Sequence, residues 1–359
     1  MNIILGLLTP LVVIALITLL HYILPGRWVT GYVKNDQTGE TLRYRLNGLL
    51  LLIVSVGLWY LLGYLDIVDF TWLYIHRWWS LAGAIIIGLT YSLVMTLSYP
   101  SVTDSFLKDY YLGRDPNPQI QGGRIDHKMW LYIIGAVLLV LHVLSFVTQH
   151  IIMYGSSINP GILLSAALLI WFVVDYCVFE HVHLYTYDIF AERVGFKLGW
   201  GCLAFYPYFY SISLWSTVDR PSPDMSIVQL VVPTVIFFAG WVMARGANMQ
   251  KFYFKTRPEK SFLGIQPKVI SDGNKTILAS GFWGVSRHIN YLGEICMALG
   301  IAAAVGHYDL IWPWLYPLYY VALLIPRQLD DDKRCLLKYG KLWEDYQKAV
   351  RYRIIPGIY

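Results

Sequence analysis

The sequence predicts an all-α membrane protein: a polytopic transmembrane helical bundle of about 9–10 spans with a cytosol-facing C-terminal half. Of its 359 residues, 57% are hydrophobic and only 14% are charged, and the mean hydropathy is +0.49. Soluble domains are about 25% charged, so this chain has too little polar surface to cover a water-soluble globule. The composition excludes nucleic-acid-binding domains, disordered tails and small disulfide scaffolds. Its four cysteines form no CxxC pair, so we expect no metal site.

Stretches of about 20 largely apolar residues, the length that a helix needs to cross a bilayer, recur along the chain. We place them near residues 3–23, 48–65, 79–98, 129–152, 161–181, 198–215, 226–244, 291–306 and 309–326. The first is interpreted as a retained span, because it lacks both a basic n-region and a small-residue cleavage site.

Positive charge is distributed asymmetrically over the loops between these spans. Of the 28 lysines and arginines, 26 fall on one side, and only Arg77 and Arg220 fall on the other. The positive-inside rule places the basic side, including the C-terminus, in the cytosol. We expect two parts: residues 1–244 as a membrane bundle and residues 245–359 as the cytosol-facing half.

The segment "SGFWGVSRHINYLGE" (280–294) groups polar and aromatic side chains just before an apolar helix. They are Trp283, Arg287, His288, Asn290 and Tyr291. An interfacial belt explains tryptophan and tyrosine at a membrane boundary. Because it does not explain His288 and Asn290, we favour a binding site.

Two further segments carry charge at helical spacing. In the tail from residue 327, one helix face is predicted to present Arg327, Asp331, Cys335 and Lys338. In "NMQKFYFK", Lys251 and Lys255 lie one turn apart and suit a phosphate. A solvated helix and snorkelling lysines are the plainer alternatives.

At these residues the sequence resembles the sterol reductases, NADPH-dependent enzymes that reduce isolated carbon–carbon double bonds of sterols. The likeness runs the length of the chain, through "LPGRWVTGYV", "GRDPNPQI", "DIFAERVGFKLGWG", "QKFYF", "SGFWGVSRHINYLGE", "KRCLLKYGKLWEDY" and "YRIIPGIY". The strings "PKVI" and "PGIY" are most similar to the 7-dehydrocholesterol reductase branch.

The resemblance implies a set of NADPH contacts in the C-terminal half and a sterol pocket formed largely by residues 1–244. The NADPH contacts that it implies are Lys251, Lys255, Leu278, Trp283, Asn290, Tyr291, Asp331, Cys335, Lys338, Tyr339 and Tyr346. Arg287, from the segment 280–294, is added to this set. Lys255 stands where the family usually has arginine, which weakens the expected preference for NADPH over NADH. The implied partners are a sterol and the lipid bilayer; the membrane is the endoplasmic reticulum in a eukaryote or the inner membrane in a bacterium. The oligomeric state stays open.

Reducing an unactivated alkene requires a proton before a hydride, and therefore an acid in a dry pocket. Tyr210 is our first candidate donor, with Asp331 and Arg327 completing a catalytic cluster. Glu180 and Asp188 are substrate-side candidates, since ionisable groups at membrane depth are costly and usually functional. Tyr210, which matches a tyrosine of the family, is the third. The alternatives are an ordinary packed aromatic for Tyr210 and a snorkelling end of a span for Glu180.

The sequence departs from the family pattern at three places: "MWLYIIGAV" lacks an arginine, Gln119 replaces one, and 330–332 read "DDD". These departures indicate an altered substrate range or reduced activity. Delta-7 is our first choice of bond, with delta-14 and delta-24(24-1) open. Two other classes remain as alternatives: a methyltransferase resembling isoprenylcysteine carboxyl methyltransferase, and a non-catalytic sterol-binding protein.

Overall fold

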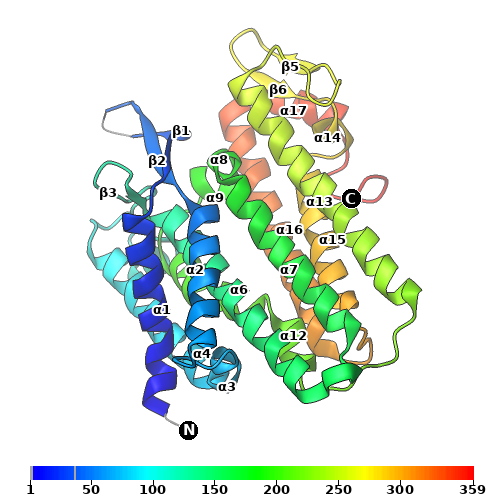
Figure 1. The fold of residues 1–359 in the computed structure, drawn as a ribbon. Coiled ribbons are helices and arrows are strands. Elements are labelled where there is room, and N and C mark those ends of the chain that lie inside the picture. The colour runs from blue at the N-terminus through cyan, green and yellow to red at the C-terminus, as the bar shows by residue number, and fades with distance from the viewer. Residues whose placement is uncertain (1–2, 36–37) are drawn as a thin grey trace. The chain divides into compact units, whose positions relative to one another are not determined.

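A computed structural model describes residues 3–35 and 38–359 and confirms a polytopic helical protein (Figure 1). The chain forms two compact units, an N-terminal unit (Met1–Pro223) and a C-terminal unit (Asp224–Tyr359). The sequence placed the division at residues 244/245. The compact units divide earlier because α13 (Ile227–Thr256) is one continuous helix that packs along α15 (Ile289–Ala304).

A single α-helix accounts for most of each of eight of the nine apolar stretches. Among residues 3–35 and 38–359, five helices are long and apolar enough to cross a membrane: α1 (Ile3–Ile23), α4 (Arg77–Leu97), α6 (His127–Tyr154), α7 (Pro160–Val178) and α13. Helices α2 (Gly48–Tyr64) and α15 are apolar but shorter. The last stretch begins α16 (Ile311–Tyr339), which continues well beyond residue 326.

The stretch at 198–215 is not a single α-helix, which corrects that expectation. It divides into α10 (Phe196–Trp200), a π-helical turn (Gly201–Phe205), α11 (Tyr206–Phe209) and α12 (Ile212–Thr217). Pro207 has no N–H to donate to the carbonyl of Leu203, so the regular α-helical ladder cannot continue there. A π-helical turn lies just before this proline, and such turns, although rare, are frequent at functional sites.

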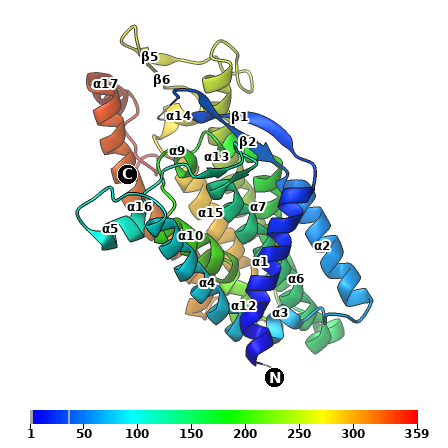
Figure 2. The ribbon, with the colours of Figure 1, turned by 90° about the vertical axis from the view of Figure 1, so that its left-hand side faces the viewer.

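In the N-terminal unit, α6 supplies more buried hydrophobic residues than any other helix, and α1 lies beside α4 and α6 (Figure 2). At Gly83 of α4, an added Cβ would lie 2.1 Å from the carbonyl oxygen of Leu7 in α1. The two helices therefore approach as closely as only small residues allow. The unit's remaining short helices are α3 (Trp72–Ile75), α5 (Phe106–Leu112), α8 (Glu180–His183) and α9 (Tyr187–Phe190).

Three antiparallel two-stranded hairpins, which the sequence did not predict, lie in the described part of the chain. They are β1 (Arg27–Lys34) with β2 (Thr41–Leu46), β3 (Gln119–Ile120) with β4 (Ile125–Asp126), and β5 (Val269–Ser271) with β6 (Thr276–Leu278). In the first hairpin Arg27 pairs with Leu46, and Tyr44 packs into a cluster with Met129 and Leu184.

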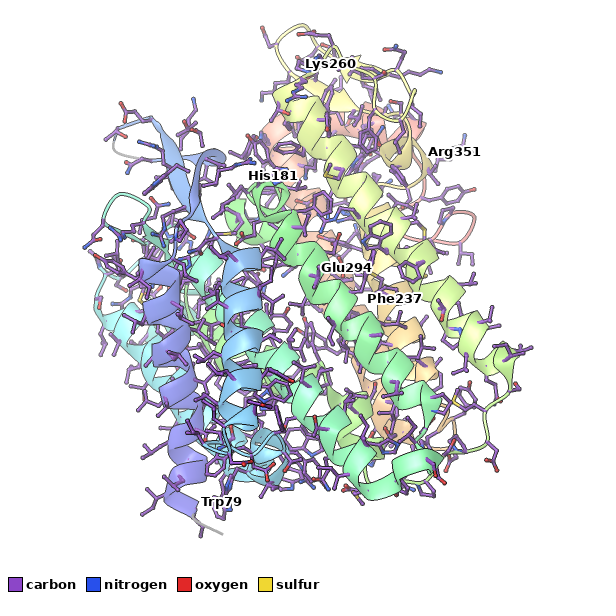
Figure 3. The ribbon with its side chains drawn as sticks, viewed as in Figure 1. Trp79, His181, Phe237, Lys260, Glu294 and Arg351 are labelled. Carbon is purple, nitrogen blue, oxygen red and sulfur yellow. The ribbon has the colours of Figure 1, made fainter. Side chains whose placement is uncertain are left out.

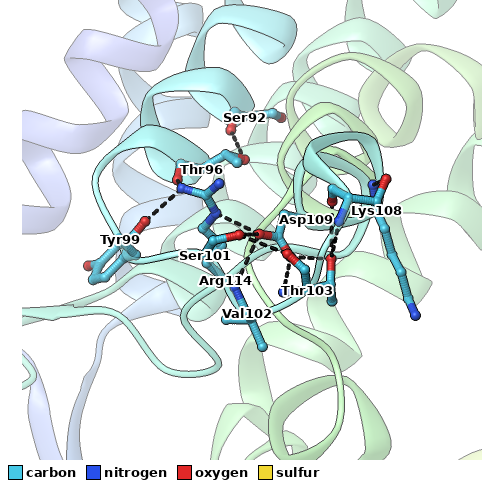
Figure 4. A network of polar contacts seen from close by, with 10 residues as sticks. Ser92, Thr96, Tyr99, Ser101, Val102, Thr103, Lys108, Asp109 and Arg114 are labelled. Carbon is cyan, nitrogen blue, oxygen red and sulfur yellow. Dashed lines mark hydrogen bonds and ion pairs between the residues drawn. The ribbon is translucent and has the colours of Figure 1, made fainter.

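A buried carboxylate organises the loop between α4 and α5 (Figure 4). Asp109 accepts hydrogen bonds from Ser101 Oγ (2.7 Å), Val102 N (3.2 Å), Thr103 N (3.0 Å), Thr103 Oγ1 (2.8 Å) and Arg114 Nε (2.9 Å). Nη1 of Arg114 donates to the carbonyl oxygens of Thr96 and Tyr99, both at 2.8 Å. These hydrogen bonds, with that of Ser101 foremost, hold the pKa of Asp109 well below its usual range.

In the C-terminal unit, α13 and α15 meet along glycines. A Cβ at Gly293 would lie 2.5 Å from Gly240 O and Ala244 N, and one at Gly300 would lie 2.7 Å from Pro233 O. Helix α16 completes the predicted helical hairpin with α15, and Gly340, at φ +56°, turns the chain into α17 (Lys341–Ala349). Strands β5 and β6, α14 (Phe282–Val285) and α17 gather at the C-terminal end of α13 (Figure 1).

Candidate functional site

The candidate site begins on the last turns of α13. The ammonium of Lys251 lies 5.4 Å from the centroid of the Trp283 ring, a cation–π contact. The indole Nε1 of Trp283 donates to Ala247 O at 2.8 Å, which fixes the ring against α13. Lys255 lies one turn beyond Lys251 and is exposed. Figure 3 shows Lys260 in the loop beyond this end of α13, whereas Phe237 lies further back along the helix.

Gln250, which sequence reasoning missed, positions the turn that carries Trp283. Its buried amide donates from Nε2 to Ser280 O (3.1 Å), and its Oε1 accepts from Phe282 N (3.0 Å). Gly281 between them has φ +58°, and a Cβ there would lie 2.3 Å from Gln250 Nε2. The sequence offered no signal for this role except that Gln250 directly precedes Lys251.

Helix α16 carries Arg327, Asp331, Cys335 and Lys338, so the predicted single helix is confirmed. Burial raises the pKa of Asp331, and the nearby charge of Lys251 opposes that rise. Burial, with Asp331 second, raises the pKa of Cys335 to about 12, so the side chain is a thiol at neutral pH. Lys251, Asp331 and Cys335 therefore lie within electrostatic reach of one another.

An apolar and aromatic wall adjoins these groups. Ile277, Leu342, Trp343, Tyr346 and Val350 form a buried cluster against which Cys335 and Tyr339 pack. The hydroxyl of Tyr346 donates to Trp283 O at 2.9 Å, and Leu278 is buried at the end of β6. The ammonium of Lys338 lies 5.2 Å from the centroid of the Tyr339 ring.

Arg287 mainly holds the C-terminal segment in place. Its Nη1 donates to Val350 O (2.9 Å) and Arg351 O (3.1 Å), and its Nη2 lies 3.6 Å from Asp332 Oδ2. The same Asp332 oxygen accepts from Gln328 Nε2 at 2.6 Å. Arg287 is thus engaged by the protein itself, and it acts on the site through the segment that it anchors.

The start of α15 presents buried polar atoms without protein partners. His288 stacks on Tyr291, with ring centroids 5.0 Å apart and planes 20° apart. Within the residues that the structure describes, His288 Nε2 and Asn290 Oδ1 are buried and have no hydrogen-bond partner. Buried polar atoms are nearly always paired, so these two are suited to contact a polar ligand. Together with Lys251 and Trp283, they fit a phosphate-bearing dinucleotide.

The substrate-side candidates all belong to the N-terminal unit. Glu180 follows the end of α7, is buried, and accepts a hydrogen bond from Gly48 N at 2.8 Å, so its carboxylate caps the first turn of α2. Asp188 is half-buried on α9. Tyr210, at the end of α11, packs edge-on against Tyr206 with a centroid separation of 4.5 Å.

The departures from the expected family pattern have visible consequences. Gln119 donates from Nε2 to Arg43 O (3.2 Å) and Asp126 Oδ2 (3.0 Å). Directly before "MWLYIIGAV", the buried Lys128 donates to Ile189 O (2.5 Å) and Asn117 Oδ1 (3.1 Å) and so joins two of the motif segments. Sequence reasoning counted Lys128 only as a loop cation, because its burial depends on tertiary packing.

Long apolar helices define a polytopic membrane protein, and its C-terminal unit carries a cationic, aromatic candidate site. The chain matches the model of the ergosterol biosynthesis ERG4/ERG24 family over residues 8–359, and it belongs to that family. Its relatives are named as reductases, so the chain is an enzyme of the oxidoreductase class that acts on carbon–carbon double bonds.

Three relatives illustrate the similarity. The delta(14)-sterol reductase of Arabidopsis thaliana is 32% identical, with 94% of this chain and 91% of that protein covered. The delta(14)-sterol reductase of Methylotuvimicrobium alcaliphilum is 30% identical, with 93% and 79% covered. The 7-dehydrocholesterol reductase of Xenopus laevis is 32% identical, with 95% and 76% covered.

Proposed function

We propose that this protein is an NADPH-dependent sterol reductase that saturates a ring double bond by protonation followed by hydride transfer. The observation that carries the proposal is the grouping of Lys251, Trp283 and unpartnered polar atoms of α15 at one end of the C-terminal unit. The names of the relatives supply the substrate class.

The site residues of the C-terminal unit have distinct roles in this proposal. Lys251 and Lys255 bind phosphate oxygens, and Trp283 offers a ring face for stacking. NADPH, when bound, supplies the hydride. Asp331 keeps a proton more readily than a solvated aspartate because burial raises its pKa, which suits an acid or a relay.

In the N-terminal unit we assign Tyr210 as the proton donor. Its ring packs among the aromatic side chains Tyr206 and Phe172, whose faces tolerate a carbocation. Glu180 and Asp188 are proposed to line the sterol side. Since the carboxylate of Glu180 already caps α2, we propose that it acts by fixing the start of that helix.

Two bonds are supported by different observations. Relatives named delta(14)-sterol reductase come from a plant, a yeast, a bacterium and the mouse, and they support delta-14. The "PKVI" and "PGIY" strings and the Xenopus laevis relative support delta-7. We therefore test both bonds in parallel.

The methyltransferase alternative predicts binding of S-adenosylmethionine, which has no phosphate for Lys251 and Lys255 to hold. The family match over residues 8–359 favours the reductase. A non-catalytic sterol-binding protein would bind the sterol without reducing it, and only an assay of turnover separates it from an enzyme.

The test uses the protein purified in detergent. NADPH and S-adenosylmethionine are titrated separately. NADPH is then incubated with a delta-14, a delta-7 and a delta-24(24-1) sterol while products are read by mass and retention time. We expect NADPH to bind and one sterol to gain two hydrogens. Binding of S-adenosylmethionine alone would refute the reductase, and NADPH binding without reduction would favour the non-catalytic protein.

Matched variants assign the residues. Lys251→Met should weaken NADPH binding by roughly tenfold or more, whereas Lys260→Met, in the exposed loop after α13, should leave it unchanged. Asp331→Asn and Tyr210→Phe should each lower turnover while the melting temperature is maintained. Full turnover in both would remove them from the catalytic assignment.

We also propose that the C-terminal unit faces the cytosol, as the distribution of lysine and arginine indicates. In sealed vesicles of known orientation, a protease on the cytosolic side should cleave the exposed loop around Lys260. Cleavage only from the opposite side would reverse the topology.

A further inference from the structure

His288 holds its position through contacts on two sides. Its backbone N–H donates to Arg353 O at 2.8 Å, and its ring, at the residue that precedes α15, stacks on that of Tyr291 in the first turn. The side chain is only 3% exposed. The orientation of the imidazole is therefore set before any ligand arrives.

The Nε2 atom of this fixed ring is buried and, in the described part of the chain, has no hydrogen-bond partner. A buried polar atom left unpaired is costly, and proteins retain such atoms where a ligand or a reaction uses them. The imidazole packs well on Tyr291, so stacking alone would be served equally by phenylalanine. The polar atom needs a separate explanation.

The charges that act on His288 are positive. Burial first, then Arg287, Lys251 and Arg353, lowers the pKa of the imidazole to about 3, so the ring is neutral at physiological pH. Asp331 and Asp332 offset two of these three cations, and the positive charge that remains favours an anionic oxygen over a cation or another donor. A neutral imidazole that donates from Nε2–H satisfies such an oxygen without adding a further buried charge.

We propose that His288 is a direct phosphate contact of the dinucleotide, with Nε2–H donating to a phosphate oxygen that Lys251 neutralises. This inference rests on the proposed function, because it assumes that NADPH occupies the C-terminal unit. It gives a specific role to His288, which lies in the segment 280–294 but is not among the NADPH contacts that the resemblance implies. The phosphate is either the 2′-phosphate or the pyrophosphate, and the two make different predictions.

Calorimetry with NADPH, NADH and 2′,5′-ADP separates these possibilities. His288→Phe keeps the stacking on Tyr291 but removes Nε2, and it should weaken NADPH binding by roughly ten- to a hundredfold. His307→Phe, in the same unit but beyond the far end of α15, is the matched control and should bind as the wild type does. A loss confined to NADPH and 2′,5′-ADP assigns the 2′-phosphate, and an equal loss for NADH assigns the pyrophosphate.

A second measurement does not depend on the folding of His288→Phe. In wild-type protein labelled with ¹⁵N-histidine, the Nε2 resonance that disappears in His288→Gln should shift when NADPH is added. No shift at saturating NADPH, or unchanged NADPH affinity in a folded His288→Phe, overturns the inference. Failure of the wild type itself to bind NADPH would instead refute the proposed function.

Discussion

A single methyl group at Gly293 tests how closely α13 and α15 must approach. The Cβ of alanine would lie 2.5 Å from Gly240 O, 2.5 Å from Ala244 N and 2.9 Å from Ala244 Cβ. Two of these neighbours are backbone atoms, which cannot move aside as a flexible side chain would. We therefore expect Gly293→Ala to push the two helices apart.

The expected cost follows from two opposing effects. Overpacking of a close helix contact costs about 1–3 kcal/mol, here toward the upper end because backbone atoms are involved. Alanine is favoured over glycine inside a helix by up to about 1 kcal/mol, which offsets part of this cost. The net loss is about 1–2 kcal/mol, which corresponds to a fall in melting temperature of roughly 2–8 °C.

The change should also reach the candidate site. Tyr291 lies in the first turn of α15 and Trp283 lies in α14, just before it, whereas Lys251 belongs to α13. Separating the helices moves the ring face away from the cation, so NADPH affinity should fall together with stability.

The assay is thermal melting in detergent, paired with NADPH titration. The matched control is Gly57→Ala in the apolar helix α2, where an added Cβ has no heavy atom within 4 Å. The control should melt at or slightly above the wild-type temperature. If Gly293→Ala also melts within a degree of the wild type, the packing argument is wrong.

Three further substitutions have defined outcomes in the same melting assay. Tyr346→Phe removes the hydrogen bond to Trp283 O and should cost about 1 kcal/mol; an unchanged melting temperature would show that the bond contributes nothing. Gln250→Leu removes two buried hydrogen bonds and should cost about 2–4 kcal/mol and weaken NADPH binding, and wild-type affinity would contradict its positioning role. Because the pKa of Asp109 is depressed in the fold, its carboxylate stabilises the protein above the ordinary carboxyl pKa of about 3.9, and this contribution is lost as pH falls through the depressed value. Asp109→Asn should therefore melt lower at pH 7 and lose stability less steeply on acidification, and parallel pH profiles would contradict this.

Hydropathy and residue spacing predicted the helices, because a helix depends mainly on residues that are near one another in the sequence. Hydropathy located the long helices, and the spacing of Asp331 and Cys335 correctly predicted one continuous helix. Pro207 is itself a signal for a helix break, since proline interrupts a helix. The high apolar content of residues 198–215 nevertheless favoured one uninterrupted span. The β1–β2 hairpin was missed because it lies in the loop between two apolar spans, whose hydropathy dominates this part of the sequence.

The site was less predictable where a residue acts through tertiary contacts. The motifs indicated Lys251 and Trp283, and the structure brings them into contact. Gln250 and Lys128 have no distinguishing pattern, because burial alone gives them their roles. Arg287 shows the reverse: the motif marks it as a ligand contact, whereas its hydrogen bonds go to the backbone of the C-terminal segment.

Many of the anchors around the candidate site are main-chain carbonyls. Trp283 bonds to Ala247 O, Tyr346 bonds to Trp283 O, and Arg287 bonds to Val350 O. A peptide carbonyl is the same acceptor whichever residue supplies it, so positions 247 and 350 can change identity without losing these bonds. The sequence can therefore change at these positions while the hydrogen bonds around the site are kept. The same arrangement can persist in proteins that share only about a third of their residues.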